Sequence, residues 1–431
     1  MKIALLHFRA GLMDGVSLEM EKWRKVLEKR GHQVVMVAGN RNPRVDVSIK
    51  EIQFDEPINS ALDKNIFDSL EDYTPSGLMN AVEERAELIR SKLKGILRNF
   101  ELVIVNNVWS LGIALPVGLG LYRCAREMKA RFIGHHHDFW WERERLSNPT
   151  TREIREILES VFPPDLPNVQ HVVINSMARE ELVKRRGLEA MVVPNVMDFD
   201  SHFPVSEELN EAIRTRVNLK MGDLVFLQAT RITPRKAVEL AVDVVRAFKE
   251  LAKGRVGMRL YNGRTFTGRV VLAFSGMCED EEYRKRLYKY AESQGVEAID
   301  LYRFVAEGGS DFFEIYSVAD FVTYPSIVEG WGNQLLEALI ARKPLVLFEY
   351  PVFLRDIKPS GLTYVSLGSS FEKEEGLVKV DETTIGRAAE EILEILFDER
   401  RYSSIVERNF EIGKEKFGFS TLEKILEDLG M

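Results

Sequence analysis

Short apolar runs alternate with longer amphipathic segments along the whole chain. In the first half, runs rich in β-branched residues predict strands at 2–7, 33–38, 101–106, 131–135 and 171–175. Helical periodicity lies between them, as in 17–30, where apolar side chains recur on one face before Gly31. This alternation is typical of βαβ units, so parallel sheets are expected.

A second series of the same kind begins at residue 224. Its predicted strands are 224–229, 270–275, 320–324 and 344–349, and its predicted helices are 236–251, 281–293, 311–318 and 334–342. Between the two series lies 193–200, a stretch rich in Pro and Asx. We interpret it as a hinge between two domains.

The expected fold class is therefore α/β, with two Rossmann-like doubly wound domains facing each other across a cleft. Residues 1–198 would form the first domain and 199–409 the second. The tail is helical in pattern, and its last helix, about 410–431, is expected to pack back on the first domain.

Composition narrows the class of protein further. The 431 residues are 45% hydrophobic, which argues against disorder, and 59 Lys and Arg against 67 Asp and Glu give a formal net charge of −8. An acidic chain has no general attraction to nucleic acid or anionic lipid, so any bound anion needs a local site. Two cysteines, Cys124 and Cys278, exclude a disulfide framework. No apolar run is long enough for a signal peptide or a membrane span, so a soluble cytoplasmic protein is expected.

Ligands of doubly wound sheets bind beside the carboxyl ends of the strands, so the loops that follow strands matter most. The first such loop ends at Gly15, at a helix entrance where backbone N–H groups could receive a phosphate. The spacing is not G-x-G-x-x-G, which disfavours a nicotinamide dinucleotide. A tight turn without a ligand is the alternative.

The strand at 131–135 ends in His135, His136, His137 and Asp138. Adjacent residues of an extended chain point to opposite faces, so a metal site is disfavoured. Catalytic or polar contact with a substrate is favoured, although one or two of these histidines are expected to be buried and satisfied. The residues that follow are candidates for acceptor contacts, with core packing and surface ion pairs as the alternatives: Trp140, Trp141, Arg143 and Arg145.

The second series places cations at a strand end. Arg231, Arg235 and Lys236 precede a long helix, and cations are slightly unfavourable in a first helical turn, which indicates an anionic ligand such as a diphosphate. Glu329 lies in a Gly-rich loop, and Glu337 lies one turn into the next helix. Two carboxylates could also be a glycosidase pair, but a phosphate-binding cluster on the same sheet argues against hydrolysis.

Over almost its whole length, the chain resembles the GT-B glycosyltransferases of glycosyltransferase family 4. The most specific mark is the pair Glu329 and Glu337 with seven residues between them, supported by Arg231 and Lys236 five apart. Further marks are 193–195 (VPN) at the hinge and His137-Asp138, which is similar to the family's histidine loop, with His136 as the other alignment. Where the family usually has Gly-Gly, this chain has Asp14-Gly15.

The resemblance implies a first domain that binds the acceptor and a second that binds a nucleotide-diphosphate sugar. It implies Glu337 on ribose, Glu329 near the transferred sugar, and His136 or His137 on the donor sugar, with Asp138 beside it. Gly15, Arg231 and Lys236 would meet the diphosphate. The donor loop would comprise Gly330, Trp331, Gly332, Asn333, Gln334, Leu335 and Glu337.

The implied activity is retaining transfer of a hexosyl unit, glucose or mannose, without metal or other cofactor. GDP-mannose, UDP-glucose and ADP-glucose are the candidate donors. The acceptor would be a small polar or phosphorylated sugar, a glycerate-type molecule or a growing glycan. Alternatives are a nucleotide-sugar epimerase, a phosphorylase or a non-catalytic nucleotide-sugar-binding protein. No nucleic acid is expected as partner, and a second copy of the chain is a further candidate.

Overall fold

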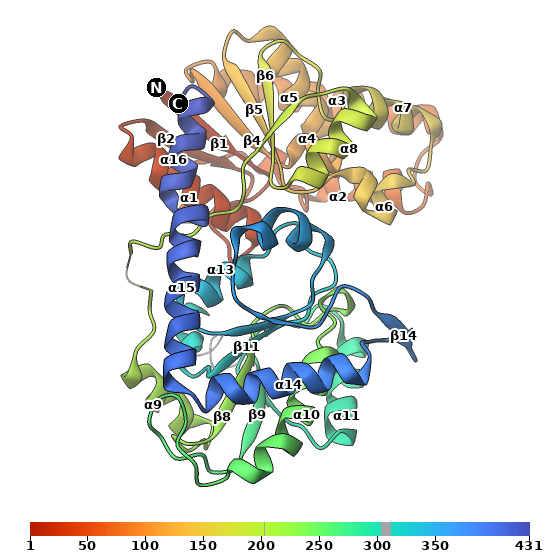
Figure 1. The fold of residues 1–431 in the computed structure, drawn as a ribbon. Coiled ribbons are helices and arrows are strands. Elements are labelled where there is room, and N and C mark those ends of the chain that lie inside the picture. The colour runs from red at the N-terminus through yellow and green to blue at the C-terminus, as the bar shows by residue number, and fades with distance from the viewer. Residues whose placement is uncertain (202, 303–311) are drawn as a thin grey trace. The chain divides into compact units, whose positions relative to one another are not determined.

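The computed structural model describes residues 1–201, 203–302 and 312–431, which form two compact units (Figure 1). The first unit comprises Met1–Val196 and Phe419–Met431, and the second comprises Met197–Gly418. The segment that returns to the first unit thus begins at Phe419, not near residue 410. Each unit is described by itself below.

The first unit is built on a seven-stranded parallel sheet with the order β3-β2-β1-β4-β5-β6-β7. Its strands are β1 (Lys2–Leu6), β2 (Gln33–Ala38), β3 (Val47–Ser48), β4 (Leu102–Asn106), β5 (Arg131–His136), β6 (Val169–Val173) and β7 (Ala190–Val192). The strand order reverses between β1 and β4, and the crevice beside their carboxyl ends is the ligand position that such a sheet offers.

Helices cover both faces of this sheet. They are α1 (Gly15–Lys29), η1 (Lys50–Ile52), α2 (Pro57–Phe67), α3 (Pro75–Leu97), α4 (Val108–Leu111), α5 (Leu115–Glu127), η2 (Trp140–Glu142), α6 (Glu144–Ser147), α7 (Arg152–Val161), α8 (Ser176–Arg186) and α16 (Phe419–Asp428). Alternate residues of β1 serve two cores, since Ala4 and Leu6 belong to one cluster and Ile3 and Leu5 to the other.

The last helix, α16, packs against α1 in the first unit. Leu422 and Leu426 are fully buried in the cluster that contains Ile3 and Leu5. At the rim, Lys29 Nζ lies 2.7 Å from Glu423 Oε1, and this exposed pair adds little to the apolar contact. The chain therefore leaves the first unit after Val196 and completes its core only after the second unit, Met197–Gly418.

The second unit repeats the design with a six-stranded parallel sheet in the order β10-β9-β8-β11-β12-β13. Its strands are β8 (Leu224–Gln228), β9 (Val270–Phe274), β10 (Glu297–Asp300), β11 (Phe321–Tyr324), β12 (Leu345–Leu347) and β13 (Val365–Ser366), beside a hairpin of β14 (Glu372–Glu374) and β15 (Leu377–Lys379). The order reverses between β8 and β11, so this unit has its own ligand position.

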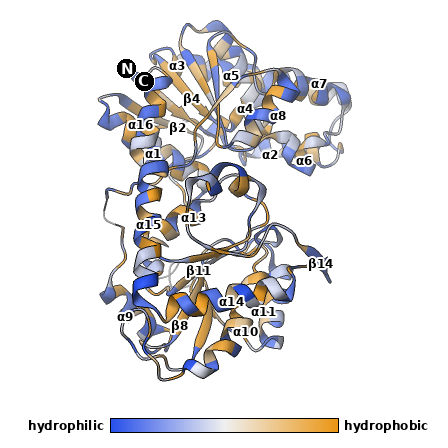
Figure 2. Cartoon of the chain, viewed as in Figure 1, coloured by the Kyte–Doolittle hydropathy of each residue, from blue (hydrophilic) through white to orange (hydrophobic). Residues whose placement is uncertain are grey.

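The helices of the second unit are α9 (Glu207–Arg216), η3 (Pro234–Lys236), α10 (Glu239–Ala252), η4 (Lys253–Arg255), α11 (Glu281–Ser293), η5 (Phe312–Ser317), α13 (Asn333–Ile340), η6 (Phe353–Ile357), η7 (Lys358–Ser360), α14 (Glu382–Leu396) and α15 (Glu399–Phe417). Asp280 begins α11 by accepting the backbone N–H of Tyr283 at 2.9 Å. Every residue of β8 and β9 is buried, and the hydrophobic colouring of these strands is visible in Figure 2.

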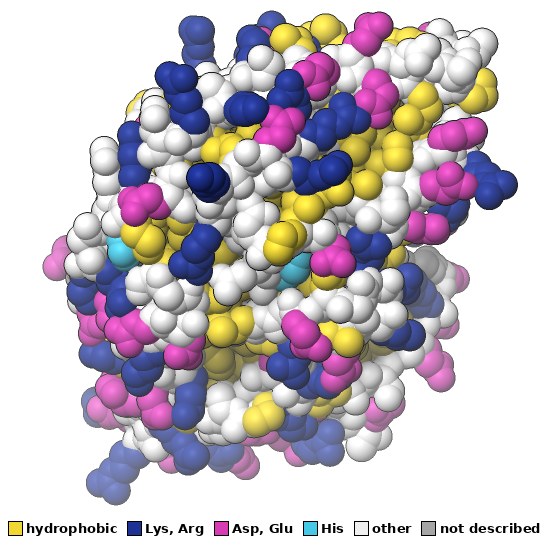
Figure 3. Space-filling model, turned by 90° about the horizontal axis from the view of Figure 1, so that it is seen from above, with side chains coloured by type: hydrophobic (Ala, Val, Ile, Leu, Met, Phe, Trp, Pro, Cys, Tyr) yellow, Lys and Arg dark blue, Asp and Glu magenta, His cyan; other side chains and the backbone are white. Residues whose placement is uncertain are grey.

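The predicted pair of parallel-sheet α/β domains is confirmed. The strand predicted at 171–175 is wrong by two residues, because β6 spans Val169–Val173 and Asn175 instead caps α8. Position 311, where a helix was predicted to start, lies outside the described residues. Within the described part of the chain, no helix has the length and apolarity that crossing a bilayer requires. Figure 3 shows a face on which basic and acidic side chains are interspersed.

Candidate active site

The loop after β8 in the second unit brings three cations to the carboxyl edge of the sheet. The backbone turns at η3, which starts at Pro234 and ends before Ala237, whose φ is 44°. This turn buries Lys236, which is 7% exposed, and its ammonium forms an ion pair with Glu329 from the loop after β11. Arg235 Nη1 lies 3.6 Å from the other Glu329 oxygen. The structure thus joins residues that are 93 positions apart in the sequence.

The charges of this cluster shift the pKa values of Glu329 and Lys236. Burial opposes ionisation of Glu329, but the Lys236 ammonium and the Arg235 guanidinium outweigh it and hold the pKa of Glu329 below its usual range. Burial lowers the pKa of Lys236, and the Glu329 carboxylate opposes that shift. Two cations against one carboxylate leave an excess positive charge, which suits a diphosphate.

Arg231 has a different partner from the one expected. Its guanidinium pairs with Glu279 in the loop after β9, and its side chain is 48% exposed. It therefore lies at the same edge of the sheet as Lys236, but its ion-pair partner is Glu279, whereas that of Lys236 is Glu329. A ligand phosphate would have to compete with Glu279 for this arginine.

The loop after β11 is shaped by a glycine. Gly332 has a φ of 142° and stands at the start of α13, and a Cβ there would lie 2.4 Å from the Tyr350 hydroxyl oxygen. Tyr350 donates that hydroxyl to the backbone oxygen of Trp331, which holds the loop in place. Gly332 makes no side-chain cap at the start of α13, and a helix N-terminus favours an anionic ligand.

The remaining side chains of this loop are mostly internal. Trp331 is 4% exposed and packs edge-on against Phe417, with ring centroids 5.8 Å apart. Leu335 is fully buried, and Gln334 donates to the backbone oxygen of Thr323 at 3.3 Å. All three side chains are thus internal, although Trp331 Nε1 and Gln334 Oε1 are buried without a hydrogen-bond partner among the described residues.

Glu337 lies one turn into α13 and is 8% exposed. The hydroxyl of Tyr316, on η5, donates to Glu337 Oε2 at 2.7 Å. A carboxylate fixed in this way on a helix that starts at the donor loop can accept hydrogen bonds from vicinal hydroxyls. The geometry is compatible with the predicted ribose contact.

In the first unit, the helix start at Gly15 is already occupied by a carboxylate. Asp14 Oδ1 accepts the backbone N–H of Ser17 at 3.0 Å, and Arg9 Nε lies 3.4 Å from Asp14 Oδ2. A phosphate at Gly15 would have to displace the Asp14 carboxylate from the helix start, which disfavours the predicted diphosphate contact. The departure from Gly-Gly to Asp14-Gly15 thus has a structural consequence.

His136 ends β5 and is 1% exposed. Its Nδ1 lies 2.6 Å from the Ser110 hydroxyl, and its Nε2 lies 2.9 Å from His171 Nδ1. His171 in turn contacts the backbone oxygen of Pro164 at 3.1 Å. Both ring nitrogens of His136 are therefore engaged inside the unit, which disfavours the predicted contact with a substrate. Burial lowers its pKa well below the usual value, so the ring is neutral.

His137 and Asp138 are held by a residue that the sequence interpretation missed. Asn107, just after β4, accepts the backbone N–H of His137 and donates to Asp138 Oδ1, both at 2.8 Å. Asn107 adopts a left-handed conformation with a φ of 54°, and such strain is often found where side chains are positioned for function. The Asn106-Asn107 pair at the end of a central strand was the available signal.

His137 differs from His136 in its partners. Its ring lies 4.2 Å from that of His135, and its Nε2 has no hydrogen-bond partner among the described residues. Burial and the neighbouring His135 lower the pKa of His137 well below its usual value. A neutral imidazole with an unsatisfied nitrogen at the carboxyl edge of the sheet is suited to bind a hydroxyl.

The four predicted acceptor residues have structural partners. Trp140 is 7% exposed and donates its Nε1–H to the backbone oxygen of Phe162 at 3.3 Å. Trp141 stacks on Phe139 with centroids 4.3 Å apart. Arg143 forms an ion pair with Asp138, and Arg145 pairs with Asp63 and Asp68. Core packing and ion pairs therefore account for these residues as they stand.

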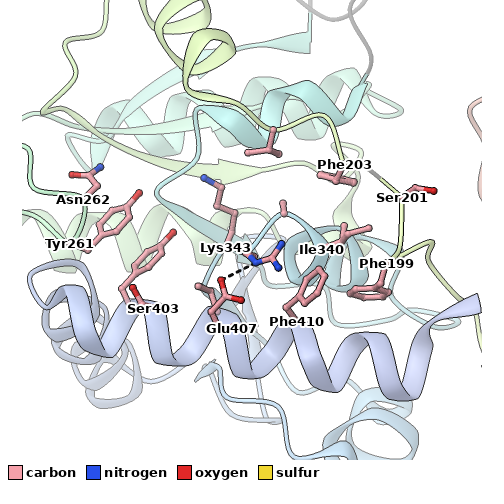
Figure 4. Close-up of a pocket in the computed structure, with 15 residues that line it drawn as sticks. Phe199, Ser201, Phe203, Tyr261, Asn262, Ile340, Lys343, Ser403, Glu407 and Phe410 are labelled. Atoms are coloured by element: carbon pink, nitrogen blue, oxygen red, sulfur yellow. Dashed lines mark hydrogen bonds and ion pairs between the residues drawn. The ribbon is translucent and has the colours of Figure 1, made fainter.

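A separate cavity of about 710 Å³ in the second unit lies at the other end of the sheet (Figure 4). Lys343 in its wall comes just before β12, and Tyr261 donates to Asp320, just before β11, at 2.9 Å. Arg342 pairs with Glu407 at its rim, 2.9 Å apart. This is the amino edge of the strands, where doubly wound sheets do not bind their main ligand. Across the described ranges, no three His, Cys, Asp or Glu side chains are grouped so that they could hold a metal ion.

Comparison with known proteins identifies the family. A model of the glycosyl transferases group 1 matches residues 210–411. The chain is 51% identical over 427 residues to the mannosylglucosylglycerate synthase of Thermotoga maritima, and 99% of each chain is covered. It is 38% identical over 425 residues to the mannosylglucosylglycerate synthase of Petrotoga mobilis, with 97% of this chain and 98% of the relative covered.

Solved structures share the fold at low identity. The catalytic domain of starch synthase IV from Arabidopsis thaliana, bound to ADP and acarbose, matches with a TM-score of 0.65 and 12% identity over 99% of this chain and 98% of that one. A glycosyltransferase from Rickettsia africae matches with a TM-score of 0.63 and 13% identity over 99% and 97%. These neighbours are GT-B glycosyltransferases. With high identity to two synthases over nearly its whole length, the chain is a glycosyltransferase and belongs to the group 1 family of GT-B type.

Proposed function

We propose that this chain transfers a mannosyl unit from a nucleotide-diphosphate sugar to glucosylglycerate. The donor class rests on the Lys236 and Glu329 site at the switch point of the second unit. The acceptor rests on the 51% identity to a mannosylglucosylglycerate synthase over 99% of both chains. We further propose that the reaction retains the anomeric configuration and that the enzyme belongs to glycosyltransferase family 4.

The second unit would bind the donor. Lys236 and Arg235 would neutralise the negative charge that grows on the diphosphate as the bond to the sugar breaks. This is the work a divalent cation would otherwise do, so we propose that none is needed. Glu337 would accept hydrogen bonds from the ribose hydroxyls. Backbone N–H groups at the start of α13 would bind phosphate oxygens.

Glu329 would act on the transferred sugar. In the free protein the Glu329 carboxylate forms an ion pair with Lys236. A diphosphate that binds Lys236 would weaken this ion pair. The loosened carboxylate can then accept sugar hydroxyls. Diphosphate binding and sugar positioning are coupled in this way through one ion pair.

The first unit would bind the acceptor and supply His137. Its Nε2, which has no hydrogen-bond partner among the described residues, would contact a substrate hydroxyl, and Asn107 and Asp138 would keep the loop in position. His136 has no part in this proposal, because its ring is committed to Ser110 and His171.

The test is transfer by the purified chain. GDP-mannose, UDP-glucose and ADP-glucose are each incubated with glucosylglycerate in EDTA, and the product linkage is read by NMR. Mannosyl transfer with retained configuration in EDTA is expected. Transfer of glucose but not mannose would refute the donor sugar. Activity that is lost in EDTA and restored only by Mg²⁺ or Mn²⁺ would refute metal independence.

A further inference from the structure

The first unit contains a cavity of about 300 Å³. Its wall is formed by Phe54, Asp55, Ser60, Asp63, Ile113 and Arg145. These residues come from the segment after β3, from α2, from the connection after β4 and from α6 after β5. All of these segments follow carboxyl ends of strands, where ligands of doubly wound sheets bind.

The same two connections that build the histidine loop also build this cavity. Asn107 and Ile113 both belong to the connection that follows β4. Asp138, Arg143 and Arg145 all belong to the one that follows β5, and Arg143 pairs with Asp138. A ligand in the cavity would therefore be bound by the loops that position His137.

The charge of the cavity excludes an anion. Arg145 Nη2 lies 2.9 Å from Asp63 Oδ2, and Arg145 also makes a two-point contact with Asp68, at 2.6 and 2.9 Å. Asp55 adds a third carboxylate to the surroundings of this one guanidinium. The local net charge is negative, so a carboxylate or phosphate group would be repelled. Binding of an anionic group of the acceptor by Arg145 is therefore disfavoured.

The lining is suited to a sugar ring. Carboxylates accept hydrogen bonds from hydroxyls, the guanidinium donates them, and the Ser60 hydroxyl can do either. The ring of Phe54, partly buried against the core and with the Arg9 guanidinium 5.1 Å from its centroid, adds an aromatic side chain to the wall. This mixture of donors, acceptors and an aromatic side chain matches an uncharged polyhydroxyl ligand.

The position of Asp63 is fixed before any ligand arrives. The backbone N–H of Ala114 donates to Asp63 Oδ1 at 3.1 Å, and Arg145 holds the other oxygen. Ala114 has a φ of 47°, and Gly112, two residues earlier, has a φ of 68°. A non-glycine residue in this conformation costs energy, which the surrounding contacts must offset. The cavity wall is thus preorganised, which lowers the cost of binding.

We propose that this cavity is the acceptor subsite for the glucosyl ring, and that it leaves the acceptor carboxylate outside. Asp63 accepts hydrogen bonds from ring hydroxyls, and Arg145 is a positioning residue that holds Asp63. The inference rests on the proposed function, since that names the acceptor.

The experiment compares Asp63→Asn with Asp68→Asn. An asparagine at 63 can still accept the Ala114 N–H, so the fold is expected to survive, and thermal unfolding checks this. Asp68 is 47% exposed and pairs with Arg145 from outside the set of lining residues, so its variant is the matched control. Asp63→Asn is expected to raise the KM for glucosylglycerate about tenfold or more, because the hydrogen bonds from the sugar hydroxyls to the charged Asp63 carboxylate are lost. The KM for the donor is expected to stay unchanged in both variants.

Two competitive inhibitors test binding of the two halves of the acceptor separately. Methyl glucoside, a neutral ring, is expected to compete with the acceptor in the unsubstituted enzyme and to compete about tenfold more weakly in Asp63→Asn. Inhibition by glycerate is expected to be the same in both. Equal inhibition by methyl glucoside in both proteins, or a loss of glycerate inhibition alone, overturns the subsite. An unsubstituted enzyme without transfer to glucosylglycerate overturns the proposed function instead, and methyl glucoside binding to the two proteins, followed by NMR, then still decides the subsite.

Discussion

The ion pair of Lys236 and Glu329 offers the sharpest test of the donor site. The two side chains are 9% and 10% exposed, so neither charge is well solvated without the other. Removing one partner of a buried pair typically costs about 3–5 kcal/mol. Arg235, 3.6 Å from Glu329, compensates for part of the loss in Lys236→Met. We therefore expect each of Lys236→Met and Glu329→Gln to lower the free energy of unfolding by about 3 kcal/mol.

The double variant is expected to cost about 3 kcal/mol in total rather than the sum of the two single costs, because each single change already abolishes the one ion pair that the two residues share. The coupling between the two sites is then about 3 kcal/mol, at the upper end for residues in contact. Denaturant unfolding of the four proteins at constant slope measures it. Glu282→Gln is the control, since its partner Lys285 and Glu282 itself are 69% and 81% exposed. A coupling below about 1 kcal/mol would refute the argument from burial.

Nucleotide binding separates the roles of the two residues. Lys236→Met is expected to weaken binding of a free nucleoside diphosphate about tenfold or more, since a charge-assisted contact is lost. Glu329→Gln releases the Lys236 ammonium, so nucleotide affinity is expected to stay the same or rise while turnover falls. Calorimetry with the nucleotide and kinetics with the sugar donor measure the two effects. Equal weakening of nucleotide binding by both variants would refute the role of Glu329 on the sugar.

The same pair predicts a pH dependence. The pKa of Glu329 is lowered in the folded chain from an ordinary value of about 4.5. The pair therefore contributes its full stability above that value and loses it as the pH falls through the lower folded pKa. Glu329→Gln is expected to flatten the acid side of the stability profile in that window, and an unchanged profile would contradict this.

Three further changes test other parts of the site. Asn107→Ala removes both hydrogen bonds to the histidine loop and is expected to lower kcat about tenfold with little change in the donor KM, measured by steady-state kinetics. Gly332→Ala would place a Cβ 2.4 Å from the Tyr350 hydroxyl oxygen and is expected to lower the free energy of unfolding by about 2 kcal/mol, whereas an unchanged melting temperature would contradict the crowding. Tyr316→Phe removes the hydroxyl that donates to Glu337. It is expected to weaken the binding of a nucleoside diphosphate about fivefold and to leave the binding of pyrophosphate unchanged, as measured by calorimetry.

The fold was predictable from the sequence where its elements are long. Strands such as β2 and β9 are buried on both faces, so they form continuous apolar runs, and helices such as α11 have clear caps. The short strands β3 and β13 have two residues each and lie at sheet edges, so they carry no periodic signal. Their positions depend on neighbouring strands that are distant in the sequence.

The site was predictable only in part, for the same reason. The loops after β8 and β11 could be identified, because glycines, cations and carboxylates cluster there in the sequence. The partners of those side chains could not be identified from the sequence. Arg145 pairs with Asp68, 77 residues away, and Arg231 with Glu279, 48 residues away. His136 and His137 are neighbours in sequence, and both rings are largely buried. Only the contact of His136 with His171, 35 residues away, distinguishes the ring with two engaged nitrogens from the ring of His137, whose Nε2 has no hydrogen-bond partner among the described residues.

The two units share one topology, but their candidate sites differ in charge. Both sheets reverse strand order beside the strand that begins the unit, and both place their polar loops at that reversal. In the second unit these loops bring Lys236 and Arg235 to a single carboxylate, which leaves positive charge for a diphosphate. In the first unit they bring neutral histidines and the carboxylates around Arg145, which suits hydroxyls. For a chain with a net charge of −8, anion binding depends on burying a cation, because only burial keeps its charge from being screened by solvent.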